Sequence, residues 1–460
     1  MAVSAKETVD QFLRTPSYIV TVMLLAALSN LFGWELPVYT VFIAVGIYAC
    51  LWGKDLLPLI PLFLSAYIAP SMHNNPGRNP DSVFALHRYG IYFGFLVAAL
   101  VIALAVRIIR QRKLFFTRKC QLLPGLLALA ITYLLSGIGS DGYAQLAPKS
   151  ILFALLQGTC LLLPYWLISC GVDWSRTRRD YLAWTGFAAG GVLLCQILGV
   201  YFSTEVVVDG IIERTNIYTG WGMYNNMGCL LAMMIPFAFY LATKYRKGWI
   251  GTVVGTAFLI GVILTCSRGS ILVGAAVYVF CTIAMLRYAN NRRANFIALV
   301  TSVVAVLLIT LLFHKQLLLL FSTLLDKALD PSTRDIIYRD GLRLFRENPI
   351  FGITFYPPAG VSWGWSTVPG FTAFFPPRFH NTFVQLLASC GILGFGAYLW
   401  HRVQMVKLFL QRGTKEALFN GCCVLVLLIC SLLDCHLFNF GPALFYAVIL
   451  ACTENCPIKK

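Results

Sequence analysis

Residues 332–352 read STRDIIYRDGLRLFRENPIFG and lie within the only long polar interruption of an otherwise apolar sequence. The interruption extends from His314 to His380 and contains seven basic residues, which are Lys315, Lys327, Arg334, Arg339, Arg343, Arg346 and Arg378. A connection of this length between two membrane spans is more often functional than a simple linker. We therefore expect the rest of the chain to hold this loop, and whatever it binds, at a membrane surface.

The composition predicts a polytopic membrane protein. Of the 460 residues, 58% are hydrophobic and 12% are charged, whereas about a quarter of the residues in soluble domains are charged. Repeated apolar runs of about 15–20 residues indicate an all-α bundle of about 12–14 transmembrane helices, with one long external loop that contains amphipathic helices. Candidate spans lie near 17–32, 36–52, 56–70, 89–106, 121–139, 150–170, 181–200, 223–243, 249–266, 269–286, 295–313, 381–401, 417–434 and 437–452. We expect the first to be an uncleaved anchor, because no small-residue cleavage site follows it.

The distribution of charge predicts the orientation. Basic turns, such as residues 107–119 and 402–415, alternate along the chain with less basic segments, such as 71–88 and the loop 314–380. If the basic turns and both termini are cytoplasmic, the whole formal charge of +17 falls on the cytoplasmic side, as the positive-inside rule requires. The membrane orientation therefore accounts for the net positive charge of the sequence, and this charge does not indicate a nucleic-acid partner.

The fifteen cysteines do not form a recognisable metal-binding or disulfide pattern. Most of them lie in apolar runs, where cysteine packs as a small hydrophobe, and there is no CxxC pair. The sequence Asp434-Cys435-His436 looks like a set of metal ligands, but its place at a helix junction favours a structural role. We expect no metal and no cofactor.

The loop contains a predicted helix that begins with a capping box, from Ser332 to Asp335. At 100° per residue, Arg339, Arg343 and Arg346 share one side with acidic residues, so this side is expected to face solvent or lipid headgroups. Arg334 falls on the apolar side near the helix N-terminus, where a guanidinium requires a partner and an anion is favoured. That partner is either an anionic ligand or a carboxylate of the protein itself.

A further arginine, Arg268, lies in a tight turn between two apolar runs. It either extends to the lipid headgroups or faces a cavity in which it meets an anion. The aromatic residues of the loop also have two interpretations, since they suit both stacking on sugar rings and the more common anchoring at the membrane interface. They are Trp363, Trp365, Phe371, Phe374 and Phe375.

Three motifs, in this order, resemble the O-antigen ligase and polymerase superfamily of bacterial envelope membrane proteins. They are Thr265-Cys-Ser-Arg268-Gly-Ser; Arg334-Asp-Ile-Ile-Tyr338 followed by Asn348-Pro-Ile-Phe-Gly352; and His380-Asn-Thr-Phe-Val-Gln-Leu-Leu-Ala-Ser-Cys-Gly391-Ile-Leu-Gly394. A fainter fourth element runs from Arg214 to Asn226, with Asn225 where the family often has proline. The resemblance covers about residues 210–400. The first 200 residues match only as membrane spans, and the predicted span count departs from the dozen usual in the family.

The resemblance implies a metal-independent glycosyltransferase at the outer face of the bacterial cytoplasmic membrane. Residues 1–200 would be amino-terminal transmembrane helices, and residues 201–460 a ligase- or polymerase-like core with the external catalytic loop 314–380. The donor would be a polyprenyl-diphosphate-linked saccharide, commonly undecaprenyl, and the acceptor a glycan or glycolipid in contact with membrane lipids. His380 and Arg334 would be catalytic. Substrate binding would involve Arg268, Arg214, Arg378, Asn381 and Asn226.

The chemistry of these residue types fits such a reaction. Guanidinium groups pair bidentately with phosphate oxygens, and histidine is suited to take the proton of an acceptor hydroxyl. We favour a polymerase over a ligase that joins finished glycan to a lipid or other acceptor. A transporter or flippase of lipid-linked or small anionic solutes is the alternative from another class. It predicts charged residues in the middle of spans, and few occur there.

Overall fold

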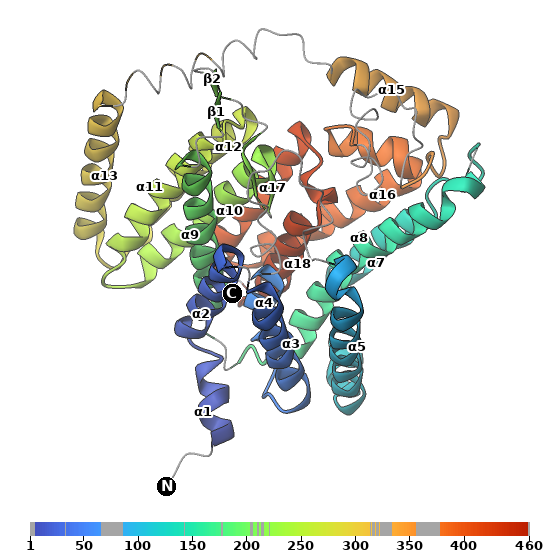
Figure 1. The fold of residues 1–460 in the computed structure, drawn as a ribbon, viewed down its shortest axis with the longest axis horizontal. Coiled ribbons are helices and arrows are strands. Elements are labelled where there is room, and N and C mark those ends of the chain that lie inside the picture. Colours follow the sequence, from blue (N-terminus) through green and yellow to red (C-terminus); the bar gives the residue numbers. More distant parts are fainter. Residues whose placement is uncertain are drawn as a thin grey trace. The chain divides into compact units, whose positions relative to one another are not determined.

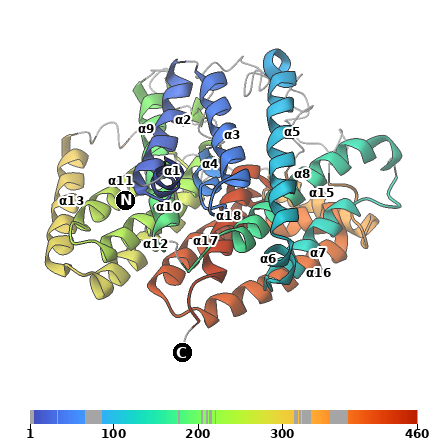
Figure 2. The same cartoon turned by 90° about the horizontal axis from the view of Figure 1, so that it is seen from below.

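The structure is a computed structural model that describes residues 5–32, 34–65, 86–141, 143–175, 178–202, 206–208, 211–212, 216–219, 221–312, 314, 318, 322, 334–355 and 378–458. These residues form an almost entirely helical protein (Figures 1 and 2). A helix occurs in each of the fourteen apolar runs, which confirms the predicted all-α class. The chain divides into two compact units. Unit 1 comprises Met1–Arg118, Cys170–Asp330 and Thr414–Val426, and unit 2 comprises Lys119–Ser169, Pro331–Gly413 and Leu427–Lys460.

Unit 1 is built around α10 (Tyr224–Lys244), which packs against α9 (Tyr181–Phe202), α11 (Trp249–Leu264) and α12 (Arg268–Tyr288). Every residue of α10 from Met227 to Thr243 is buried. Its other helices are α1 (Ala5–Phe12), α2 (Pro16–Phe32), α3 (Glu35–Leu51), α4 (Leu59–Ser65), α5 (Leu86–Arg110), α6 (Arg112–Thr117) and α13 (Arg292–Leu312).

Two short antiparallel hairpins precede α10. Strand β1 (Val207–Val208) pairs with β2 (Ile211–Ile212), so that Val207 is opposite Ile212. Strand β3 (Tyr218–Thr219) pairs with β4 (Gly222–Met223) in the same manner. The sequence did not predict these strands, because each has only two residues.

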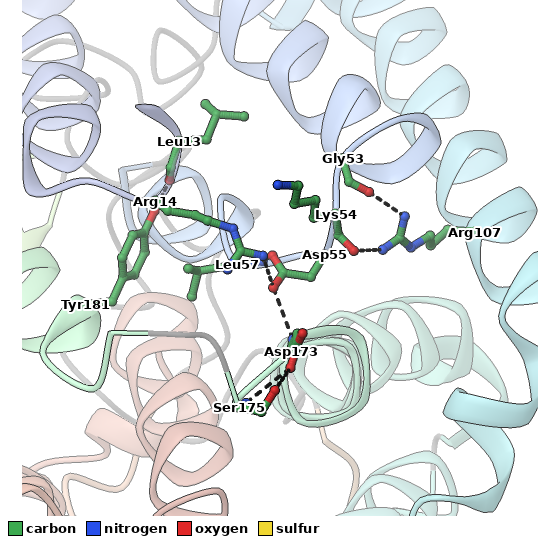
Figure 3. A network of polar contacts seen from close by, with 10 residues as sticks. All are labelled: Leu13, Arg14, Gly53, Lys54, Asp55, Leu57, Arg107, Asp173, Ser175 and Tyr181. Carbon is green, nitrogen blue, oxygen red and sulfur yellow. Dashed lines mark hydrogen bonds and ion pairs between the residues drawn. The ribbon is translucent and has the colours of Figure 1, made fainter. Parts of the chain in front are cut away.

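A polar network in unit 1 ties its amino-terminal helices together (Figure 3). The carboxylate of Asp55, 4% exposed, accepts a hydrogen bond from Arg14 Nη2 at 2.5 Å and another from the backbone N–H of Asp173 at 3.1 Å. Arg107 donates to the carbonyl oxygen of Gly53 and to the next carbonyl oxygen, both at 2.8 Å. These contacts satisfy charges and backbone groups that would be costly to leave unpaired in an apolar surrounding.

Unit 2 contains α7 (Leu123–Leu134), most of α8 (Tyr143–Gly171), α15 (Arg334–Glu347), α16 (Thr382–Gln411), the 3-10 helix η3 (His436–Phe438) and α18 (Phe440–Glu454). Helix α16 packs against both α7 and α15. Helix α17 (Lys415–Leu433) begins in unit 1 and ends in unit 2.

Within the described parts of the chain, seven helices are long and apolar enough to cross a membrane, or eight if the bent pair α1 and α2 forms one span. The seven are in α5, α8, α9, α10, α12, α16 and α17. Four further apolar helices, in α3, α7, α11 and α18, have only 10–17 residues. Each of the fourteen predicted runs therefore contains a helix, but neither group includes α4, which has 7 residues, or α13, which has 21.

Helix α16 is interrupted at Gly391, where φ is 64° and ψ is −162°. The residues that follow α15 make backbone hydrogen bonds to the groups that this break leaves without helical partners. The N–H of Ile392 donates to the carbonyl oxygen of Pro349 at 2.9 Å, and the carbonyl oxygen of Ala388 accepts from the N–H of Ile353 at 2.9 Å. A break inside a membrane-spanning helix is tolerated only when such partners replace the lost helical hydrogen bonds.

Glycine is required on both sides of this junction. A Cβ atom on Gly391 would lie 2.3 Å from the carbonyl oxygen of Ile350, and a Cβ on Gly352, whose φ is 68°, would lie 2.3 Å from the carbonyl carbon of Ser389. Left-handed backbone conformations are costly for residues other than glycine. The two glycine-containing motifs read from the sequence thus pack directly against each other.

Candidate functional site

The loop helix α15 packs against α16 (Figure 1), and apolar side chains of α15 make this contact. Leu344 is buried in a cluster with Phe379 and Ala388, and Ile337 packs against the same cluster. The approach is close, because a Cβ atom on Gly341 would lie 2.5 Å from Val384 Cγ1. This is the face that the helical periodicity predicts to be buried.

The arginines of α15 differ in their surroundings. Arg339 is exposed and paired with Asp335, with 2.6 Å between Nη2 and Oδ2. Arg343 is also exposed and paired with Glu347, with 2.8 Å between Nη1 and Oε1. Arg334 is half-buried, and the structure of the described residues gives its guanidinium no ion pair and no hydrogen bond. Of the two partners that the sequence left open for Arg334, a carboxylate of the protein is not found among these residues.

His380 is held at the start of α16 in a left-handed backbone conformation, with φ at 51°. The next residue, Asn381, is the N-cap of the helix, and its side-chain oxygen accepts hydrogen bonds from the N–H groups of Phe383 and Val384 at 2.8 and 3.2 Å. Such capping satisfies N–H groups that have no partner within the helix. Asn381 therefore has a local structural task in addition to the substrate contact that we predict for it.

The imidazole of His380 contacts a carboxylate that the sequence interpretation assigned only to structure. His380 Nδ1 lies 3.1 Å from Asp434 Oδ1, and the two side chains are 32% and 16% exposed. Asp434 Oδ1 also accepts from the backbone N–H of Cys435 at 2.7 Å. Burial by itself would raise the pKa of Asp434, but the hydrogen bond from His380 and the nearby charges of His436 and His380 outweigh burial and lower this pKa. The group is therefore an anionic carboxylate beside an imidazole.

Tyr338 connects α15 to this pair. Its hydroxyl donates a hydrogen bond of 3.2 Å to the backbone carbonyl oxygen of His380. Burial raises the pKa of Tyr338, while the charge of Arg334, one helical turn earlier, acts in the opposite direction. Tyr338 is thus a neutral phenol, one turn after Arg334 on α15, that links this helix to the backbone of His380 just before α16.

Arg378 is directed toward η3. Its Nη2 donates to the carbonyl oxygen of Phe438 at 2.9 Å, and its guanidinium carbon lies 5.5 Å from the centroid of the Phe438 ring. Burial lowers the pKa of Arg378 to about 10, against the opposing effects of Cys435 and Asp434, so the side chain remains cationic at neutral pH. Nη1 is buried and has no hydrogen-bond partner in the described part of the chain. The structure thus places Arg378 between the start of α16 and η3.

A second group of candidate residues lies in unit 1, where two helices begin side by side. Ser267, the N-cap residue of α12, hydrogen-bonds through Oγ to Asn225 Oδ1 in the first turn of α10, at 2.9 Å. Arg268 is the first residue of α12 and is exposed, and Asn226 is half-buried in the first turn of α10. Two helix N-termini combine their partial positive charges here, which favours an anion. Arg214 lies outside the described residues.

The structure therefore gathers Arg334, Arg378, His380 and Asn381 in unit 2 and Arg268 with Asn226 in unit 1. It adds Asp434 and Tyr338, neither of which the sequence interpretation assigned to the site. Among the residues that the structure describes, no three His, Cys, Asp or Glu side chains are grouped so that they could hold a metal ion. Metal independence remains a prediction.

Comparison with known proteins adds one match. Residues 253–399 match the model of the O-antigen ligase family. No curated protein matches the chain at a significant level. The matched region contains Arg268, Arg334, Arg378, His380 and Asn381, whereas Asp434 lies beyond its end. The apolar helices and this match together indicate a multi-pass membrane protein. This match confirms the resemblance read from the three motifs, because residues 253–399 are similar to the O-antigen ligase domain of the O-antigen ligase and polymerase superfamily.

Proposed function

We propose that this protein is a membrane glycosyltransferase that transfers or polymerises glycan from a polyprenyl-diphosphate-linked donor at the outer face of the bacterial cytoplasmic membrane. The observation that carries the proposal is the arrangement in unit 2. The guanidinium of Arg334 has no ion pair in the described structure, Tyr338 one turn later on the same helix donates a hydrogen bond to the backbone of His380, and Asp434 contacts the imidazole of His380.

The leaving group of such a donor is a lipid diphosphate, whose negative charge grows as the glycosidic bond breaks. Arg334 is suited to this charge, because a guanidinium contacts two phosphate oxygens at once and this one is not neutralised by a described carboxylate. Its half-buried position strengthens the interaction, since water screens it less than at the surface. The resemblance also implies that Arg268, at the N-terminal end of α12 in unit 1, and Arg214 take part in substrate binding.

His380 would act as the general base. With its Nδ1–H donating to Asp434, Nε2 carries a free lone pair that can accept the proton of the acceptor hydroxyl. The acceptor oxygen forms a bond to the anomeric carbon, the bond from that carbon to the diphosphate oxygen breaks, and the polyprenyl diphosphate leaves with the bonding electrons. The proton moves to His380, and the anionic Asp434 stabilises the resulting imidazolium. Arg378, Asn381 and Asn226 would complete the binding surface.

We favour a polymerase, in which the acceptor is another lipid-linked glycan, over a ligase that joins finished glycan to a different acceptor. Both reactions use the same donor, so the diphosphate site and the base would be common to them. The size distribution of products in cells that lack the protein separates the two. Loss of all long chains indicates a polymerase, and accumulation of unattached long chains indicates a ligase.

The test of the proposed site compares two arginines of the same helix. In purified, reconstituted protein with a lipid-linked donor, Arg334→Lys and Arg334→Ala should both reduce the rate of polyprenyl diphosphate release by about ten- to a hundredfold, because a lysine cannot make the bidentate contact. Arg343→Ala, which loses only exposed ion pairs, should retain most of the activity. Equal losses at positions 334 and 343, with equal expression and insertion, would contradict the role of Arg334.

A further inference from the structure

The outer side of α15 contains one arginine that is neutralised by nothing in the described structure. Arg339 and Arg343 are paired with acidic residues of their own helix, but Arg346 is exposed and makes no ion pair or hydrogen bond to a described residue. The sequence placed all three on one side that faces solvent or lipid headgroups. The structure separates them, because among the described residues Arg339 and Arg343 have acidic partners and Arg346 has none.

An apolar surface lies immediately beyond Arg346. Ile350, four residues later, is 56% exposed, and Ile392 and Leu393, which follow the break in α16, are 51% and 44% exposed. Backbone hydrogen bonds place these residues together, since Ile392 N–H donates to the carbonyl oxygen of Pro349 and Leu393 N–H to that of Ile350. Arg346 thus lies one turn before three exposed apolar residues whose backbones are held together.

The depth of this patch indicates what covers it. Helix α16 is a candidate membrane span that starts at Thr382, and the break at Gly391 lies about 14 Å farther along its axis. Ile392 and Leu393 therefore face the hydrocarbon of the bilayer, and Ile350 is held at the same depth. Arg346 is one turn earlier, about 5 Å nearer the start of α16, and its long side chain can extend from there to the level of the headgroups. A cation at that level next to exposed apolar side chains matches an amphiphile with an anionic head.

We infer that Arg346, Ile350, Ile392 and Leu393 form a binding surface for a phospholipid of the surrounding leaflet. The guanidinium of Arg346 contacts the phosphate of the headgroup, and an acyl chain lies along the three apolar side chains. This site is separate from the proposed donor site. Arg334 is twelve residues earlier in the helix, about 18 Å along its axis, so one diphosphate cannot contact both arginines.

The test uses the full-length protein purified in detergent and titrated with phosphatidylglycerol. Bound lipid is counted by native mass spectrometry, and the thermal unfolding temperature is followed in parallel. Arg346→Gln should weaken binding of one phosphatidylglycerol by about fivefold and reduce the associated thermal stabilisation. Arg343→Gln, which removes the same charge one turn away, should bind as the wild type does. Ile350→Asn should also weaken binding, because it removes apolar contact without changing the charge.

Two further measurements identify the source of the phosphate. Inorganic phosphate alone should give no stabilisation, and an equal effect of free phosphate would overturn the lipid assignment. A polyprenyl phosphate should not displace phosphatidylglycerol preferentially, and preferential displacement would assign the surface to the donor instead. Identical lipid binding by the wild type, Arg346→Gln and Arg343→Gln would overturn the inference altogether. Neither substitution touches a buried contact, so the variants should fold as the wild type does.

Discussion

The substitution Gly391→Ala tests the junction on which the arrangement of unit 2 depends. At this position φ is 64° and ψ is −162°, a region of backbone conformation that is almost restricted to glycine and costs other residues about 1–3 kcal/mol. The added methyl group would also lie 2.3 Å from the carbonyl oxygen of Ile350. Since a backbone atom cannot rotate away as a side chain can, the chain after α15 has to shift.

The shift would weaken the hydrogen bonds that close the break, from Ile392 N–H to Pro349 and from Ile353 N–H to Ala388. Each such bond contributes about 0.5–1.5 kcal/mol net. Together with the backbone term, the expected loss is on the order of 4 kcal/mol, a large effect for a single substitution. Because the same shift displaces α15 from α16, glycosyl transfer should fall as well.

A matched control lies five residues away on the same helix. Gly396 is exposed, and a Cβ atom placed on it would meet nothing within 4 Å. Gly396→Ala should therefore leave stability unchanged or increase it by up to about 1 kcal/mol, through the better helix propensity of alanine. Unfolding in detergent by a denaturant titration measures both variants. Equal stability of Gly391→Ala and Gly396→Ala would refute the reasoning, since it would mean that α16 does not need the break.

Three further outcomes are expected. The pKa of Asp434 is lowered in the folded protein, so the stability that its ionised form contributes is complete above the usual aspartate pKa of about 3.9 and is lost as the pH falls below it. Asp434→Asn should therefore make the free energy of unfolding depend less on pH in this acid range, and an unchanged pH dependence would contradict the contact with His380. Activity of the reconstituted protein should survive EDTA, whereas strict dependence on Mg²⁺ or Mn²⁺ would count against phosphate binding by arginine alone. A reporter near Trp365 should lie outside the cytoplasm and one near Arg412 inside it, and the reverse pattern would invalidate the outward-facing site.

The helices could be predicted because apolar runs identify them, but their ends could not. Residues predicted to span 381–401 belong to a helix that continues through Arg402 and Lys407 to Gln411. Charged side chains indicate a membrane boundary without ending a helix, since their backbone still forms helical hydrogen bonds. In the same way α8 begins at Tyr143, before the predicted start at 150, and includes Pro148 in its first turns. The hydropathy of a segment therefore predicts which residues contact lipid, but it does not predict the residue at which the helix ends.

The site was predictable only where its residues are close in sequence. Helical periodicity separated the buried side of α15 from its exposed side, because residues of one helix share a fixed rotation. The partner of His380 was missed, since Asp434 is 54 residues away and their contact depends on where α16 begins relative to the end of α17. The available signal was the cluster Asp434-Cys435-His436, which was noticed and interpreted as structural. The direction of the Arg378 side chain was equally beyond a sequence pattern.

The glycine motifs around Gly352 and Gly391 explain how Arg334 is held in place although it lies on a loop helix. In an apolar surrounding, the backbone groups freed at Gly391 must find partners, and they find them in the chain directly after α15. Helix α15 is therefore fixed at two points, by Pro349 at its C-terminal side and by the bond from Tyr338 to the carbonyl oxygen of His380. Arg334 precedes Pro349 by fifteen residues. One residue more or fewer within α15 would rotate Arg334 by about 100° relative to this anchor. The spacing between the arginine motif and the proline motif, and not the length of the loop, therefore determines the direction in which Arg334 faces.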